Sequence, residues 1–139
     1  MEKHKLAITR KEHFNAAHRL HNKNWSDEKN KEVFGKCNNP NYHGHNYELE
    51  VTIIGYMNED TGYVIDTKIL STIIKEKVLE PLDHKNLNVE VSHFENVNPT
   101  VENIAIVIYN LIKNEISKDL DLKIKLYETP RNFVEYPFR

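Results

Sequence analysis

The segment KCNNPNYHGHNY, residues 36–47, combines the only cysteine of the chain with a His-Gly-His pair that follows it closely. A thiol and two imidazoles at this spacing are compatible with a metal site, with a nucleophile and its base, or with coincidence. Side chains two residues apart on a β-strand point to the same side, so His43 and His45 converge in an extended segment. Neutral imidazoles suit Zn²⁺, and catalytic zinc commonly takes three protein ligands and keeps a fourth position open. We therefore expect a zinc site that contains both histidines.

The third zinc ligand is expected to come from another strand. His18, in the segment FNAAHRL, comes at the end of the first predicted strand, and a hairpin-like return of the chain brings that end beside His43 and His45. The small pair Ala16-Ala17 leaves room there. The alternative ligand is His13, but bulky Phe14 follows it directly.

Three roles are compatible with Cys37: a fourth zinc ligand, a nucleophile or acid/base group, or a small buried apolar residue, which is the commonest role of a lone cysteine. Its neighbours, Lys36 and a run of asparagines, are polar and typical of a loop. A nearby dication and lysine favour the thiolate form. We interpret Cys37 as a general base in a loop over the zinc, and the sequence leaves ligation open.

Two further motifs contain groups that can move or accept protons. In PLDHKNLN, Asp83 and His84 form a carboxylate–imidazole pair of the kind that relays a proton, although an ordinary helix-terminal histidine is the more common reading. In LYETPRN, Glu128 has the strand parity of the apolar residues Ile124 and Leu126, so it points inward or is a solvated turn residue. An inward carboxylate needs donors, and a ligand with an amidine-like N–C–N edge supplies two.

Basic residues near these motifs are Arg19, Lys36 and Lys85. They are candidates to contact phosphate, but lysine and arginine are usually surface residues, and we favour that reading.

The composition is that of an ordinary globule, and 139 residues fit one domain, 1–139. The net charge of −2 argues against a dedicated nucleic-acid binder. No apolar run approaches the ~20 residues of a membrane span, and the N-terminus lacks the pattern of a signal peptide. A single cysteine fits a reducing compartment, so we expect a cytoplasmic protein with no membrane or nucleic-acid partner.

Hydrophobic periodicity predicts strands at both ends of the chain and helices in the middle. Strands are expected over 5–14 and 47–54, and a hairpin over 122–136. Helices are expected over 67–80, capped by Asp66, and from Asn98 or Thr100 onward. Residues 20–41 are predicted to form a long loop. The order ββααββ predicts an α+β fold, a four-stranded antiparallel sheet with two helices on one face.

The segments FNAAHRL, FGKCNNPNYHGHNYELEVTIIG, TGYVID, PLDHKNLN, NPTVENIA and LYETPRN, in this order, resemble the 6-pyruvoyltetrahydropterin synthases over essentially the whole chain. The resemblance implies a tunnelling fold, in which the sheets of several subunits join into a β-barrel, usually a homo-hexamer of two trimers. Active sites of this family form between subunits. The implied reaction, in tetrahydrobiopterin biosynthesis, is the zinc-dependent conversion of 7,8-dihydroneopterin triphosphate to 6-pyruvoyltetrahydropterin with release of triphosphate.

The resemblance also implies a role for each matching residue. The zinc ligands are His18, His43 and His45, the proton acceptor is Cys37, and the pair Asp83 and His84 assists proton transfer. Glu128 anchors the amino-pyrimidine edge of the pterin, and Thr100 and Glu102, in NPTVENIA, are expected to help bind the substrate.

Two alternative functions remain. Related enzymes convert the same substrate to 6-carboxytetrahydropterin for deazaguanine (queuosine) biosynthesis. They hold the cysteine and the His-Gly-His closer together, whereas here residues 38–42 intervene, as in the pyruvoyl-forming group. The other alternative is a non-catalytic zinc- or pterin-binding module, which would retain its ligand without liberating triphosphate.

Overall fold

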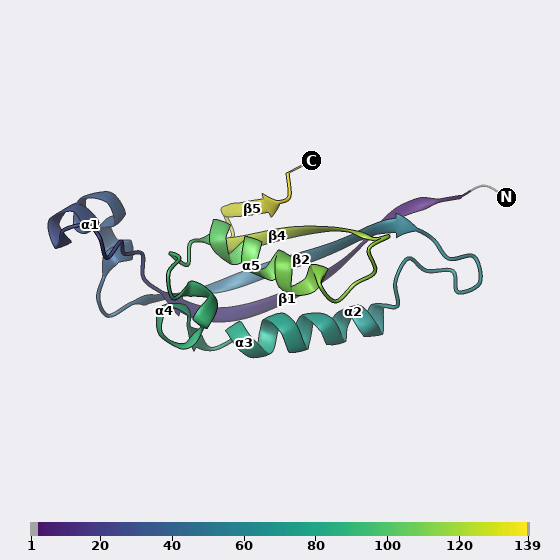
Figure 1. Cartoon of the computed structure of the whole chain (residues 1–139), viewed down its shortest axis with the longest axis horizontal. Helices are drawn as coiled ribbons and strands as arrows, with labels where there is room; N and C mark the ends of the chain where they lie inside the picture. The colour runs from purple at the N-terminus through teal and green to yellow at the C-terminus, as the bar shows by residue number, and fades with distance from the viewer. Residues whose placement is uncertain (1–2, 139) are drawn as a thin grey trace.

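Residues 3–138 are described by a computed structural model, which is built on a five-stranded sheet in the order β3-β1-β2-β4-β5. The long strands β1 and β2 pair antiparallel from end to end, and β4 and β5 extend the sheet as an antiparallel hairpin (Figure 1). The strands are β1 (Lys5–His18), β2 (His43–Tyr56), β3 (Lys85–Asn86), β4 (Asp121–Thr129) and β5 (Asn132–Tyr136). The predicted hairpin over 122–136 is confirmed.

The helical segments lie along the sheet and at one of its ends. Helix α2 continues through a π-helical turn into α3 without a break, and α1 stands beyond one end of the sheet (Figure 1). The α-helices are α1 (Asp27–Phe34), α2 (Thr67–Ile74), α3 (Glu80–Leu82), α4 (Leu87–Glu90) and α5 (Val101–Lys113). The π-helical turn is Lys75–Leu79, and 3₁₀ turns span Gly35–Asn38 and Ser92–Phe94.

One face of the sheet and the apolar stripes of the helices form a single core. From Tyr47 to Ile53, alternate residues of β2 are buried to 1% exposure or less, as the period-two pattern predicts. The opposite face is polar, with a hydrogen bond between the hydroxyls of Thr9 and Thr52. The core includes Tyr47, Leu49, Val51 and Ile53 of β2, Ile124 and Leu126 of β4, Leu70 and Ile74 of α2, and Ile104, Ile108 and Ile112 of α5.

Both predicted helix starts are confirmed by their caps. The Asp66 carboxylate accepts a hydrogen bond from the Lys68 N–H, and the Thr100 hydroxyl accepts one from the Asn103 N–H. Each bond satisfies one of the N–H groups that a helix leaves unpaired in its first turn. None of the helices in the range 3–138 is both long enough and apolar enough to cross a membrane.

The prediction of a four-stranded antiparallel sheet was wrong in one respect: the sheet is mixed. A fifth strand, β3, pairs parallel to β1 at Ala16 and Ala17. It is two residues long, too short for any periodicity, and hydrogen bonds hold the chain there: His84 N–H donates to the Asn15 carbonyl, and Asn15 N–H donates to the Asp83 carboxylate.

The prediction of a loop over residues 20–41 was also wrong, because this stretch contains α1 and the 3₁₀ turn Gly35–Asn38. Helix α1 is mostly polar, so it lacks the apolar stripe by which a helix is found in a sequence. Polar groups hold it instead. Ser26 caps it, and buried Asn30 donates to the carbonyls of Asn22 and Ser26.

Candidate active site

Three imidazoles meet where β1 ends and β2 begins. His18, the last residue of β1, lies opposite His43, the first residue of β2, and His45 follows on the same face of β2. One ring nitrogen from each lies within 4.8 Å of the other two. The rival ligand His13 is exposed, on the opposite face of β1.

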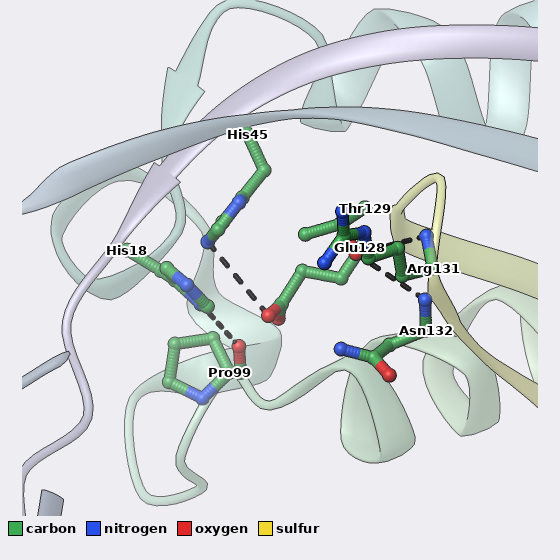
Figure 2. A network of polar contacts seen from close by, with 7 residues as sticks. All are labelled: His18, His45, Pro99, Glu128, Thr129, Arg131 and Asn132. Atoms are coloured by element: carbon green, nitrogen blue, oxygen red, sulfur yellow. Dashed lines mark hydrogen bonds and ion pairs between the residues drawn. The ribbon is translucent and has the colours of Figure 1, made fainter.

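The hydrogen bonds of these rings leave three nitrogens without a partner. His18 Nδ1 lies 2.6 Å from the Pro99 carbonyl oxygen (Figure 2). A carbonyl only accepts, so Nδ1 carries the proton and Nε2 presents a lone pair. His18 Nε2, His43 Nδ1 and His45 Nε2 are buried and have no hydrogen-bond partner among the described residues. Unpartnered buried nitrogens are costly, so their convergence fits a bound cation.

The environment keeps His18 and His43 in the neutral form that a metal requires. Burial, opposed by the Pro99 carbonyl and supported by repulsion from the other two rings, lowers the pKa of His18 to about 4. Burial also lowers the pKa of His43, assisted by His45 and opposed by Glu128. The set of three imidazole nitrogens, with His18 fixed by a backbone carbonyl, could hold a metal ion.

Glu128 points inward toward the same place. It comes near the end of β4, and its Oε1 lies 3.8 Å from His45 Nε2 (Figure 2). The turn that follows is held by the Thr129 hydroxyl, which accepts hydrogen bonds from the N–H groups of Arg131 and Asn132. The prediction that the Glu128 side chain points inward is therefore confirmed. Its carboxylate lies next to a hairpin turn that hydrogen bonds hold in place.

Cys37 lines the cavity in front of these groups. The cavity has a volume of about 700 Å³, and its walls include Cys37, His43, His45 and Glu128, together with Lys36. The cysteine is half-buried and free. It is not among the groups that gather within metal-binding distance, which are the three histidines alone for the part of the chain that is described. Cys37 therefore lines the same cavity as His43 and His45 without belonging to the histidine cluster.

This combination matches a known family. The profile of the 6-pyruvoyl tetrahydropterin synthase family matches residues 7–138. This chain belongs to that family. It is 46% identical over 129 residues to the 6-pyruvoyl tetrahydrobiopterin synthase of Poecilia reticulata, covering 93% of this chain and 88% of the relative. The human enzyme of the same name is 43% identical, with 93% and 89% covered. The structure of Caenorhabditis elegans 6-pyruvoyl tetrahydropterin synthase matches over 100% of both chains, with a TM-score of 0.92 and 38% identity.

Membership of this synthase family makes the chain a 6-pyruvoyl tetrahydropterin synthase-like lyase, and it confirms the resemblance found in the sequence. The α+β architecture is likewise that of the family's solved structures. The three histidines fit the metal centre of such an enzyme on their own geometry.

The pair Asp83 and His84 is formed, but a single chain does not bring it to the cavity. His84 Nδ1 lies 3.0 Å from Asp83 Oδ1, and the His84 side chain is 81% exposed. Burial alone would raise the pKa of Asp83, but hydrogen bonds from Asn15 and His84 and the charge of His84 lower it below its ordinary value. The pair adjoins β3, on the side of β1 away from β2.

Thr100 and Glu102 are two residues apart at the start of α5 and have different surroundings. Thr100 follows Pro99, the residue that holds His18, but its hydroxyl is used as the cap of α5. Glu102 lines a separate cavity of about 290 Å³ with Ile106 and Tyr136. Within one chain, Glu102 therefore does not reach the space in front of the histidines.

Two groups at the site had no signal in the sequence. The Pro99 carbonyl holds His18, and a backbone carbonyl leaves no mark on residue type. Tyr47 was predicted only as a core residue. Its ring stacks on Phe14 at 4.9 Å, but its buried hydroxyl has no partner among the described residues. Burial and then the charge of Glu128 raise the pKa of Tyr47, so its hydroxyl stays protonated.

Proposed function

We propose that this chain is a zinc-dependent lyase that converts 7,8-dihydroneopterin triphosphate to 6-pyruvoyltetrahydropterin and releases triphosphate. The observation that carries the proposal is the convergence of three imidazole nitrogens that have no partner among the described residues. Two of these rings, those of His43 and His45, line a cavity together with Cys37 and Glu128. The names of the relatives support the pyruvoyl-forming reaction. Three nitrogen ligands and an open position favour Zn²⁺ over cations that prefer oxygen.

The residues divide the chemistry among them. When bound, the metal supplies Lewis acidity, which makes carbons next to coordinated oxygens more acidic. Cys37 accepts a proton from such a carbon, because it lines the same cavity as His43, His45 and Glu128. Glu128 holds the amino-pyrimidine edge of the pterin through two hydrogen bonds, the strong arrangement for a carboxylate. The ring and the reacting carbons are thereby fixed relative to the thiol.

Asp83 and His84 are proposed to act in the active site of a neighbouring subunit. Their hydrogen bond is formed, His84 is exposed, and both lie away from the cavity of their own chain. A homo-hexamer whose sites form between subunits brings such a pair to a second cavity. Mixing Cys37→Ala and His84→Ala chains after co-denaturation tests this. Recovered activity supports shared sites, and no recovery contradicts them.

The test of the reaction is to incubate the zinc-loaded protein with 7,8-dihydroneopterin triphosphate and identify the products by mass. Release of triphosphate with 6-pyruvoyltetrahydropterin supports the proposal. Formation of 6-carboxytetrahydropterin contradicts it in favour of the deazaguanine pathway. Ligand that is retained without triphosphate release identifies a binding module.

A further inference from the structure

A second cavity lies beside the metal site, and the function proposed above does not use it. Its volume is about 450 Å³, and its lining includes Arg19, Tyr42 and Asn98. Each of these residues adjoins a group of the metal site in the sequence: His18, His43 and Pro99, respectively. Neighbouring Cα atoms are about 3.8 Å apart, so the backbone that lines this cavity adjoins the backbone that carries the metal site.

Arg19 is held rigidly at this cavity without an acidic partner. Its N–H donates to Asn88 Oδ1 at 2.8 Å, and its carbonyl accepts from Asn88 Nδ2 at 2.9 Å. Its Nε donates to the Asn38 carbonyl at 2.9 Å. No described carboxylate lies within ion-pair distance of its guanidinium group. The terminal N–H groups of Arg19 are therefore fixed in position and remain available to an anion.

His21 is fixed in the same way, and the network determines its tautomer. Its N–H donates to Asn98 Oδ1 at 3.0 Å. Asn38 Nδ2 lies 2.8 Å from the Leu20 carbonyl oxygen and 2.9 Å from His21 Nδ1. A carbonyl only accepts, so this Asn38 atom is the amide nitrogen, and His21 Nδ1 must accept. The neutral His21 ring therefore carries its proton on Nε2, which makes it a donor at the cavity.

The third donor is Lys23, whose Nζ donates to Asn96 Oδ1 at 3.2 Å. The cavity thus presents two permanently positive side chains and a histidine N–H. Glu95, which is exposed, is the only acidic residue that lines it in the described part of the chain. The whole chain has 21 acidic and 19 basic residues, but the lining of this cavity has more basic than acidic side chains. This local positive charge favours the binding of an anion.

We propose that this cavity binds a chain of phosphates, through Arg19, His21 and Lys23. On the proposed function, which this inference deepens, the ligand is the triphosphate of the substrate and then of the leaving group. Charge-assisted bonds from guanidinium and ammonium groups suit phosphate oxygens. The competing cations, Lys31 and Lys36 at the Cys37 cavity, are exposed, and their ammonium groups make no hydrogen bond to another described residue. They are less preorganised, and ordering them costs more side-chain entropy.

The probe is inorganic triphosphate, titrated into the zinc-loaded protein by calorimetry. Lys23→Gln removes one charge from an exposed side chain and leaves the fold intact, and Arg19→Gln removes the second. Each substitution is expected to weaken binding at least tenfold. Lys118→Gln, on an exposed segment far along the chain, is the matched charge control and should bind like the wild type. 7,8-Dihydroneopterin, which lacks the phosphates, should bind Lys23→Gln and wild type equally.

Three outcomes overturn the proposal. The first is a wild type that does not bind triphosphate. The second is binding that is lost in Lys31→Gln/Lys36→Gln but kept in Lys23→Gln and Arg19→Gln. The third is binding that His43→Ala abolishes while those two variants keep it, because the phosphates would then lie on the metal.

Phosphate binding at this cavity and the proposed lyase activity can be tested separately. Triphosphate binding through Arg19 and Lys23 without turnover of the pterin substrate supports the cavity and refutes the lyase. Turnover whose KM for the triphosphate substrate is unchanged in Lys23→Gln and Arg19→Gln supports the lyase and overturns the cavity.

Discussion

Metal binding should stabilise the folded chain, and removing zinc with a chelator should lower its thermal midpoint. In the metal-free protein, His18 Nε2, His43 Nδ1 and His45 Nε2 are buried and have no partner within residues 3–138, and each such group costs about 1–3 kcal/mol. A ligand that binds only the folded state, present at 100 times its Kd, adds about 2.7 kcal/mol. For a domain of this size, each kcal/mol moves Tm by roughly 4 °C. The expected shift is about 10 °C.

The assay is thermal unfolding followed by circular dichroism, with chelator and then with excess zinc, and the quantity compared is the zinc-induced shift of Tm. His18→Ala and His43→Ala should each lose most of the shift. His13→Ala is the matched control, because this exposed histidine lies on the other face of β1, and it should keep the full shift. An undiminished shift in His43→Ala, or a shift lost in His13→Ala, would refute the assignment of the ligands.

Three further predictions follow from the site. Cys37→Ala should keep one equivalent of zinc by elemental analysis and lose most turnover, and a loss of metal would instead make the thiol a ligand. Glu128→Ala should weaken pterin binding about tenfold or more by calorimetry, since it removes a charged hydrogen-bonding partner, and unchanged affinity would exclude an anchor role. Burial holds the pKa of His18 near 4 against an ordinary 6.5, so the unfolded chain takes up a proton first as the pH falls. The free energy of unfolding of the metal-free protein should therefore have its full value above pH 6.5 and fall by roughly 3 kcal/mol as the pH is lowered to 4. Urea titrations at a series of pH values measure this. The same pH dependence in His18→Gln would contradict the prediction.

Much of the sheet was predictable because a strand with one buried face alternates apolar and polar residues along its sequence. The run from Tyr47 to Ile53 fixed which side of β2 is covered, and the same parity placed His43 and His45 on that side. The position of His18 then followed from an antiparallel return, which pairs it with His43. The inward direction of Glu128 rested on the same period-two argument along β4.

What escaped prediction is fixed by polar contacts between distant segments. Strand β3 exists because backbone groups near Asp83 and His84 bond to Asn15. Helix α1 is organised by the amide of Asn30 in place of an apolar stripe. The hydrogen bond from His18 Nδ1 to the Pro99 carbonyl joins residues 81 positions apart. A contact of this kind produces no periodic pattern in a single sequence.

The central claim is that three imidazoles bind one zinc ion and that the thiol of Cys37 does not. X-ray absorption at the zinc edge of the loaded protein measures this directly. The expected spectrum has nitrogen and oxygen neighbours at about 2.0–2.1 Å with the scattering of three imidazoles, and it is unchanged in Cys37→Ala. A sulfur neighbour at about 2.3 Å that disappears in Cys37→Ala would contradict the account.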